Sequence, residues 1–263
     1  MHPGVGPWRE ANHLYVDQSG LAVRLTEPGP PLVLLDAGLG AATNAVAALT
    51  CARALGPAQQ RELHVWSLET TLAPVRLALE DAAGFPFLQP FAAAVQQLLR
   101  DDVVHLPRAT WRLVVGDMAE AWRRADLPAA HVVFFDPFSP AANPQLWTPA
   151  ALRLLRARCD DGAEGCALYT YSASTPTRVS FLLGGFFVGA GVSVGTRRET
   201  TVAATRPGLL RAPLGERWMA RWERSSARAP HGQPLTDEVE RALRDHPQFH
   251  AGTGQPTFNR LAT

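Results

Sequence analysis

The sequence contains no lysine, and all 25 of its basic residues are arginines. This absence excludes a P-loop, because the Gly-Lys-Ser/Thr motif of a P-loop uses its lysine to reach nucleotide phosphates. Only three cysteines occur, at Cys51, Cys159 and Cys166, and none has the Cys-x-x-Cys spacing of a structural zinc site. A small, odd number of cysteines also argues against a disulfide framework.

Long hydrophobic runs are missing as well. No stretch approaches the roughly 18–20 consecutive apolar residues that span a membrane, and the first ten residues do not read as a signal peptide. We therefore expect a cytoplasmic protein without a membrane segment. His246 and His250 lie four residues apart, but Pro247 between them argues against a metal-binding helix, so we expect no metal site.

The residues that are present favour one α/β domain with additions. The chain has 263 residues, of which 46% are hydrophobic, and this is enough for a large core. We divide it into an N-terminal segment (1–30) with a possible hairpin over 13–25, a main domain (31–206), and a C-terminal basic helix and tail (207–263).

The main domain begins with a strand, a glycine turn and a helix. The apolar run 32–35 ends in Asp36, Gly38 and Gly40 follow, and residues 41–55 have a helical pattern. This unit is typical of nucleotide-binding α/β folds, in which the turn lets a ligand approach the backbone closely. The alternative is an ordinary turn between a strand and a helix, since Thr43 occupies the position of the third glycine of a dinucleotide motif.

The pattern that follows predicts a mainly parallel sheet. Five strands alternate with helices, and two final strands enclose a basic turn at 195–199. The strands are expected at 32–35, 63–68, 111–115, 132–135, 166–171, 188–194 and 200–204. A seven-stranded sheet of this kind, closed by an antiparallel hairpin, indicates an α/β Rossmann-like fold of the type found in S-adenosylmethionine-dependent methyltransferases.

Each of the first four expected strands is followed by an acid. These are Asp36, Glu69, Asp117 and Asp136. Such acids suit a nucleoside with a cationic amino acid tail: one can accept hydrogen bonds from ribose hydroxyls, another from the amino group of adenine, because a carboxylate is only an acceptor. The alternative is that each acid is solvated or caps the next helix.

The segment 134–149, FFDPFSPAANPQLWTP, carries the most specific motif. It resembles the methyltransferase domain of the MnmC-type family, bacterial enzymes that complete 5-methylaminomethyl-2-thiouridine in tRNA. The residues that match are Asp136, Phe138, Pro140, Asn143, Pro144, Trp147 and Thr148, whereas Pro137 replaces the usual glycine.

Other motifs support the resemblance, which runs from about residue 32 to residue 204. Asp36, Gly38, Gly40 and Asn44 match the family's first motif, although Ala42 stands where its last glycine would be. Glu69 and Asp117 match its acids after the second and third strands. The turn with Arg197, Arg198 and Glu199 resembles its closing turn.

The resemblance implies methyl transfer from S-adenosylmethionine to a primary amine on the wobble uridine of tRNA. Asp36, Gly38, Gly40, Asn44, Glu69, Asp117 and Asp136 are the candidates for holding the cofactor. Asp136 would orient the amine or take its proton, or would instead hold the ammonium group of the cofactor. Phe138 and Trp147 would stack on bases, the alternative for Trp147 being a loop anchor in the core.

The remaining candidates concern the substrate and its partners. Pro140, Asn143, Trp147, Arg197, Arg198 and Glu199 are expected on the substrate side. Residues 197–228 carry a local net charge of +5 although the whole chain has only +1, which suits RNA. Trp218 and Trp222 in this region share one helix face, as core residues commonly do. The chain has no room for the flavin oxidase domain of the longer family members, so a separate flavin oxidase is expected to act before it.

Two other functions remain open at this stage. A small-molecule methyltransferase on the same fold would have an enclosed apolar pocket over Asp136, whereas a tRNA enzyme would have an open one beside an arginine patch. A catalytically lapsed nucleotide-binding scaffold is the second alternative, permitted by Ala42 and Pro137. The retained acids at the strand ends argue against the scaffold.

Overall fold

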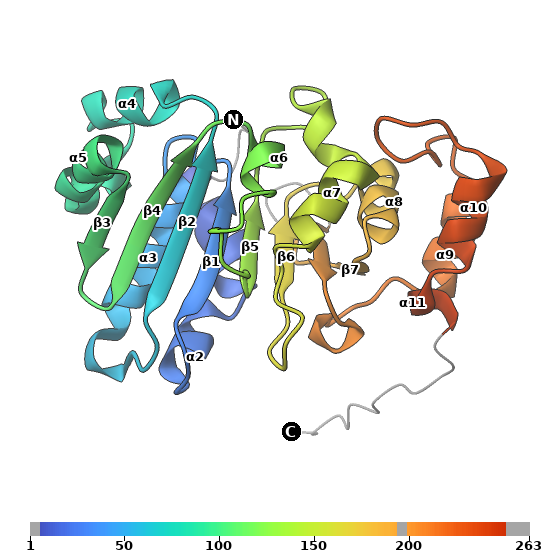
Figure 1. The fold of residues 1–263 in the computed structure, drawn as a ribbon, viewed down its shortest axis with the longest axis horizontal. Coiled ribbons are helices and arrows are strands. Elements are labelled where there is room, and N and C mark those ends of the chain that lie inside the picture. The colour runs from blue at the N-terminus through green and yellow to red at the C-terminus, as the bar shows by residue number, and fades with distance from the viewer. Residues whose placement is uncertain (1–5, 194–198, 251–263) are drawn as a thin grey trace.

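The computed structural model describes residues 6–193 and 199–250 as a single eight-stranded sheet between two layers of helices (Figure 1). The strand order is β3-β4-β2-β1-β5-β6-β8-β7. The strands are β1 (Leu32–Ala37), β2 (Leu63–Glu69), β3 (Val103–Leu106), β4 (Ala109–Val115), β5 (Val132–Phe135), β6 (Ala167–Thr170), β7 (Phe187–Ala190) and β8 (Thr201–Ala204).

The Rossmann-like α/β fold with a closing antiparallel hairpin is confirmed, with one strand more than expected. The central strands β4, β2, β1, β5 and β6 run parallel, and β8 pairs antiparallel with both β6 and β7. The additional strand, β3, pairs antiparallel with β4 at the edge of the sheet. It has only four residues and one buried side chain, so it leaves little trace in the hydrophobic pattern.

Alternate residues of the central strands face opposite layers of helices. On β1, Leu32 and Leu34 join one hydrophobic cluster, and Val33 and Leu35 join the other. Because successive side chains of a strand point to opposite faces, a sheet covered on both sides needs a continuous apolar run, as β1 has.

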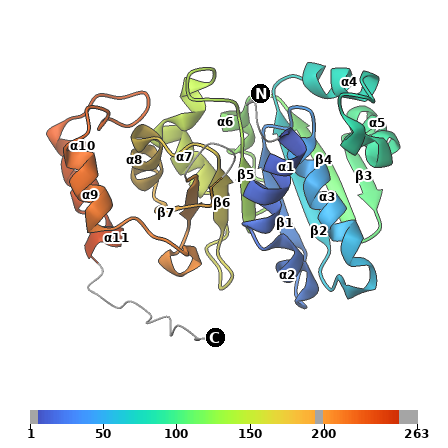
Figure 2. The same cartoon turned by 180° about the vertical axis from the view of Figure 1, so that it is seen from behind.

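The first layer of helices packs on the face seen in Figure 2 and belongs largely to the N-terminal half of the chain. It contains α1 (Pro7–Glu10), the π-helix η1 (Ala11–Asp17), α2 (Leu21–Thr26), α3 (Thr43–Leu55), α4 (Ala73–Glu80) and α5 (Ala92–Asp101). Short 3-10 turns, η2 (Gly56–Ala58) and η3 (Pro86–Phe91), join these elements.

The second layer covers the opposite face and extends into the C-terminal region. It contains α6 (Met118–Ala121), η4 (Pro144–Trp147), α7 (Pro149–Arg156), α8 (Thr175–Leu183), α9 (Glu216–Glu223) and α10 (Asp237–Arg244). The turn η5 (Pro207–Leu209) follows β8, and α11 (Pro247–His250) ends the described part of the chain. Trp218 and Trp222 of α9 are buried in this layer, as their spacing suggested.

The hairpin expected over 13–25 is wrong, because this segment is helical. The buried side chains Ala11, Leu14, Leu21 and Leu25 follow helical spacing, with Gly20 in the left-handed conformation at the break between η1 and α2. These residues pack beside α3, so tertiary burial prevails over the local alternation of apolar and polar residues. No helix in the described ranges is long and apolar enough to cross a membrane.

Candidate functional site

A cavity of about 620 Å³ lies at the carboxyl ends of the central strands. It is lined by the turn after β1, by the end of β2, by the loop after β5 and by residues from α1 and η1. The chain runs outward from β1 to β2 and β4 on one side, and to β5 and β6 on the other. The cavity therefore lies at the point where the strand order reverses, which is where open α/β sheets bind ligands.

The turn between β1 and α3 forms the floor of the cavity. Gly38 has a φ of +105°, and a Cβ atom there would lie 2.4 Å from the backbone oxygen of Asp136. Gly40 has a φ of +52°, with no atom within 4 Å of such a Cβ. Gly38 is therefore required where this turn packs closely against the loop after β5. Gly40, in contrast, leaves space open to the cavity. Ala42, in place of the family's last glycine, also adopts a positive φ of 61°.

Glu69 ties this turn to the end of β2. Its Oε2 accepts a hydrogen bond of 2.9 Å from the backbone N–H of Gly40, and its Oε1 accepts one of 2.8 Å from the N–H of Thr70. The side chain is buried yet lines the cavity. Oε1 also accepts hydrogen bonds from the Thr70 hydroxyl and the Thr71 N–H, whereas Oε2 accepts only the one from Gly40 among the described residues. Because a carboxylate oxygen has two lone pairs, Oε2 retains one for a ligand hydroxyl group.

Asp36 lies fully buried beneath the turn. Ser67 donates to its Oδ2 at 2.7 Å, and Trp111 donates through Nε1 to the Ser67 hydroxyl. Its Oδ1 has no hydrogen-bond partner among the described residues. Burial raises the pKa of Asp36 to about 8, partly offset by the Ser67 hydrogen bond, with Asp136 and Glu69 adding smaller increases.

Asp136 joins the loop after β5 to the start of α3. Asn44 donates through Nδ2 to its Oδ2 at 3.2 Å. Burial raises the pKa of Asp136 to about 7, and the Asn44 hydrogen bond opposes that rise. Asn143 holds the same loop by donating to the carbonyl of Pro137 at 2.8 Å. A carboxyl group that titrates near neutrality is suited to proton transfer.

Phe138 stands out in this loop because it is 52% exposed and has a φ of +59°. A bulky residue in the left-handed region is uncommon and costs backbone strain. Its ring lines the cavity together with Ser139 and Ala142. The structure therefore places Phe138 at the opening, where it can contact a ligand.

The structure brings most of the predicted cofactor residues together. Gly38, Gly40, Asn44, Glu69 and Asp136 all line the cavity, with Asp36 buried directly below. These features fit S-adenosylmethionine: carboxyl groups for a cationic ligand, an unpartnered buried oxygen at Asp36, and free space at Gly40.

Asp117 does not line the cavity. It is exposed, and its Oδ1 accepts a hydrogen bond of 2.9 Å from the N–H of Glu120, which makes it the N-cap of α6. The Asp117 carboxylate nevertheless follows β4, beside the Glu69 end of β2. Its contact with adenine stays a prediction.

Several predicted substrate residues lie elsewhere. Trp147 is fully buried, with its ring 4.9 Å from that of Phe135, so the expectation that it stacks on a base is wrong and it anchors the loop. Glu199 forms an ion pair of 3.1 Å with the buried Arg178. Pro140 and Asn143 belong to the loop but do not line the cavity. Arg197 and Arg198 lie outside the described residues.

The N-terminal wall of the cavity was not anticipated. Pro7, Glu10, Ala11 and Tyr15 line it from α1 and η1, and Tyr171 lines it after β6. Recognising residues 7–17 as helical would have predicted this wall. The π-helix η1 packs beside α3 and so comes close to the turn that precedes α3 (Figure 2).

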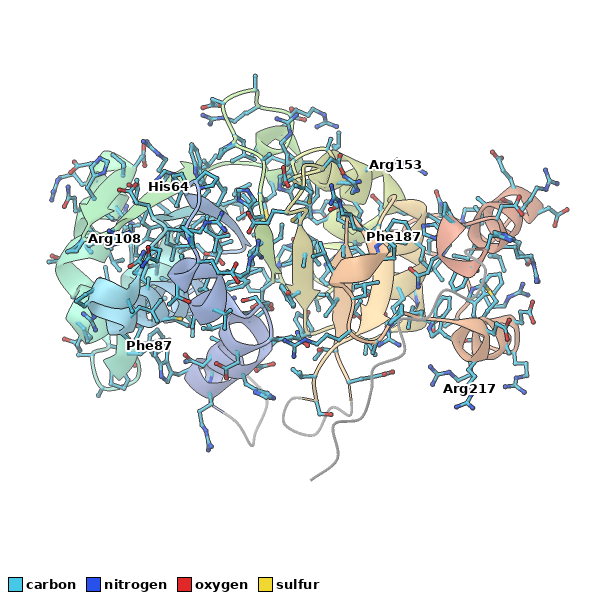
Figure 3. The ribbon with its side chains drawn as sticks, turned by 90° about the horizontal axis from the view of Figure 1, so that it is seen from below. His64, Phe87, Arg108, Arg153, Phe187 and Arg217 are labelled. Carbon is cyan, nitrogen blue, oxygen red and sulfur yellow. The ribbon has the colours of Figure 1, made fainter. Side chains whose placement is uncertain are left out.

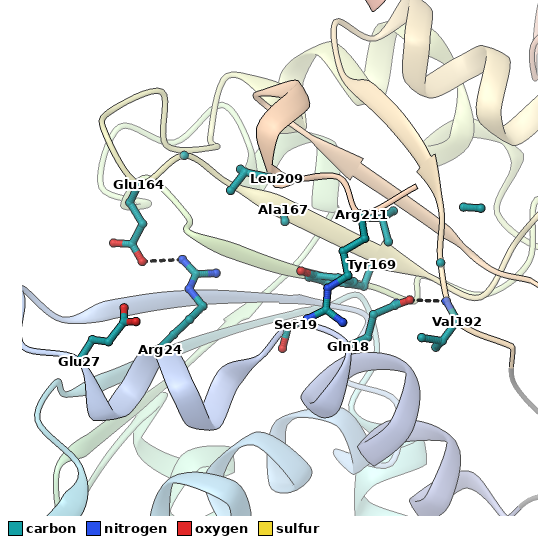
Figure 4. Close-up of a pocket in the computed structure, with 14 residues that line it drawn as sticks. Gln18, Ser19, Arg24, Glu27, Glu164, Ala167, Tyr169, Val192, Leu209 and Arg211 are labelled. Carbon is teal, nitrogen blue, oxygen red and sulfur yellow. Dashed lines mark hydrogen bonds and ion pairs between the residues drawn. The ribbon is translucent and has the colours of Figure 1, made fainter. Parts of the chain in front are cut away.

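A second cavity, of about 490 Å³, lies between the N-terminal helices and strands β6 and β8 (Figure 4). Arg24 and Arg211 line it, and so do Glu27 and Glu164. Arg24 forms an ion pair with Glu164, with 2.6 Å between Nη2 and Oε1. Because the basic and acidic residues of this lining balance, the second cavity indicates no particular class of ligand.

Comparisons with known proteins point to one group. Residues 87–206 match the family model described as S-adenosyl-L-methionine-dependent methyltransferase. The tRNA 5-methylaminomethyl-2-thiouridine biosynthesis bifunctional protein MnmC of Pseudomonas putida (strain W619) is 29% identical over 222 residues, covering 81% of this chain and 33% of that protein. Its counterpart in Pseudomonas entomophila (strain L48) is 30% identical over 225 residues, with the same coverage. The chain thus spans about a third of the length of these relatives.

A solved structure agrees with these matches. The crystal structure of MNMC2 from Aquifex aeolicus is 25% identical and superimposes with a TM-score of 0.65, covering 91% of this chain and 74% of that one.

Proposed function

The chain belongs to the MnmC-type family of S-adenosylmethionine-dependent methyltransferases, and from this premise we propose that it methylates the primary amine of an aminomethyl group on the wobble uridine of tRNA. The tRNA substrate is inferred from longer relatives that are named for tRNA modification, of which this chain covers a third.

One observation carries the proposal: the loop after β5 is joined to the cofactor turn. Asn44, at the start of α3, donates to Asp136, and the Asp136 carbonyl oxygen occupies the space that a side chain at Gly38 would need. A carboxyl group on the substrate side of the cavity is therefore held at a fixed position relative to the turn that would hold the cofactor.

The proposed roles follow from these positions. When bound, S-adenosylmethionine supplies an electrophilic methyl group on a sulfonium. Glu69 would accept hydrogen bonds from ribose hydroxyls, and Asp36 would offset the positive charge of the ligand. Asp117 would accept from the amino group of adenine at the end of β4.

Asp136 acts on the substrate amine. An amine attacks only when it is neutral, and a carboxyl group with a pKa of about 7 can accept its proton near physiological pH. Holding the amine in line with the methyl group contributes much of the rate, up to ~7–11 kcal/mol for well-oriented reactants. Phe138, exposed at the opening, would stack on the uracil ring.

A second candidate is a methyltransferase of small amines on the same fold. Among the described residues, those that line the cavity include Glu10, Glu69 and Asp136 but no arginine. The exposed Arg217 of α9 lies at the far end of the molecule from His64 and Arg108 of the β2–β4 side (Figure 3). An acidic lining with no arginine among the residues that the structure describes suits a small cationic substrate.

Methyl transfer separates these two functions. The purified protein is incubated with S-adenosylmethionine and tRNA that carries the unmethylated aminomethyl group, and the nucleosides are analysed by mass spectrometry. We expect one methyl group on the wobble uridine, and its loss in Asp136→Asn. A protein that binds the cofactor but leaves this tRNA unchanged contradicts the tRNA assignment and favours a small amine.

A further inference from the structure

Tyr15 is a buried side chain on the substrate side of the cavity that the roles above do not use. It is only 2% exposed, and it lines the cavity from the π-helix η1. Its ring packs 5.1 Å from that of Phe134 on β5, the strand that leads into Asp136. π-Helical turns are rare and frequently occur at functional sites.

The hydroxyl group of Tyr15 has no hydrogen-bond partner in the described part of the chain. A buried polar atom is nearly always paired, and one that is not calls for an explanation. If packing on Phe134 were the only role of this residue, phenylalanine would serve without the cost of an unpaired hydroxyl. The unpaired hydroxyl oxygen therefore indicates that a bound ligand supplies the missing hydrogen bond.

Among the acids around Tyr15, the strongest electrostatic neighbour is Asp136, the carboxyl group assigned above to the substrate amine. Burial raises the pKa of Tyr15 well above its usual value, and among the nearby acids Asp136 adds most to this rise, Glu10 adds less and Asp36 adds least. Glu10 and Tyr171 also act on it and line the same cavity. The phenol stays neutral, so its oxygen keeps both its proton and its lone pairs.

We propose that the Tyr15 hydroxyl binds the acceptor amine, accepting a hydrogen bond from its N–H group. This inference rests on the proposed function. Because the phenol oxygen accepts a hydrogen bond from the N–H group, the lone pair of the amine nitrogen stays directed at the methyl group. It is a catalytic contact that orients the nucleophile, distinct from the proton acceptor Asp136.

The reaction balances with these two residues. The amine nitrogen forms a bond to the methyl carbon as the carbon–sulfur bond breaks, and that electron pair remains on sulfur. The nitrogen becomes a secondary ammonium, and its extra proton passes to the Asp136 carboxylate. Tyr15 loses and gains no proton overall.

The test compares Tyr15→Phe with Tyr169→Phe as a matched control. Tyr169 is also a buried tyrosine on the same face of the sheet, but it lines the second cavity. Because Tyr15→Phe keeps the ring that packs on Phe134 and removes a buried hydroxyl without a partner, we expect a melting temperature no lower than that of the wild type and an unchanged S-adenosylmethionine affinity. Loss of one hydrogen bond to the reacting group should lower kcat by roughly 10- to 100-fold.

KM for tRNA separates this role from a structural one. Phosphate contacts dominate RNA affinity, so KM should change less than about twofold in Tyr15→Phe, and Tyr169→Phe should match the wild type. Wild-type kcat in Tyr15→Phe, or a loss of cofactor binding equal to the loss of rate, overturns the inference alone. A wild type that does not methylate tRNA overturns the proposed function, and the Tyr15 inference with it.

Discussion

Two carboxyl groups of the cavity lie in surroundings that favour their neutral form. Burial is the main cause of the raised pKa at both Asp36 and Asp136. A cation bound beside them reverses that preference, because an opposite charge favours the ionised form. In the proposed complex, the positive charge of the cofactor would therefore favour the ionised form of Asp36 that burial disfavours in the free protein.

Replacing Asp36 by asparagine should stabilise the free protein in a pH-dependent way. With a folded pKa of about 8 and an ordinary value of 3.8, Asp36 binds more protons in the folded state, so its contribution to stability is lost as pH rises from about 4 to about 8. We expect the melting temperature of Asp36→Asn to exceed that of the wild type most at pH 8, with the difference shrinking toward pH 5. A difference that stays constant between these pH values contradicts the assignment.

The site residues whose location was predicted correctly from the sequence are those whose position follows from the strand topology. Parallel strands end at one edge of a sheet, so Asp36, Glu69 and Asp136 had to meet there. The direction of a side chain within a loop depends on tertiary packing, which the pattern does not encode. Trp147 therefore turned into the core, although it belongs to the motif that names the family.

The turn between β1 and α3 shows how one element serves both the fold and the cavity. Gly38 faces the backbone of the loop after β5, whereas Gly40 faces open space. Two residues apart, they meet different requirements, and the sequence motif alone does not distinguish them. This contrast can be measured with a pair of alanine variants.

Gly38→Ala should lower the free energy of unfolding by roughly 3 kcal/mol or more, since it combines backbone strain with a clash against the Asp136 oxygen. Gly40→Ala should cost only about 1 kcal/mol, the penalty of alanine in the left-handed region. Its Cβ projects into the cavity, so it should instead weaken cofactor binding. Urea unfolding and calorimetry provide the two readouts. Equal stability losses in the two variants contradict the assigned roles.

The N-terminal helices are the element that sequence patterns missed. Residues 13–25 alternate in part like a strand, but their buried side chains have helical spacing once α3 is beside them. A short segment with two possible periodicities is decided by the surface on which it packs. For this reason, the sequence did not predict the N-terminal wall of the cavity, which includes Tyr15.

At the scale of the whole molecule, the fold was predictable because hydrophobic runs and their order specify it. The strands β1, β5 and β6 are buried at every position, whereas β2 and β4 contain polar, half-buried residues such as His64 and Arg112. All five appeared in the sequence pattern at nearly their observed positions. The edge strand β3, half exposed, did not. The exposed arginines of α9 were apparent in the sequence, but only the fold shows that α9 lies at one end of the molecule, beyond β7 and away from β1 and β2 (Figure 1).

The most direct test of the central claim is calorimetric titration of S-adenosylmethionine into the wild type and into Asp36→Ala, Glu69→Ala and Trp147→Phe. The account predicts saturable binding by the wild type, loss of it in the two acid variants, and its retention in Trp147→Phe, because Trp147 is buried in the core and does not itself line the cavity. A folded wild type that does not bind, or a Glu69→Ala variant that binds equally well, contradicts the cavity at the ends of β1, β2 and β5 as the cofactor site.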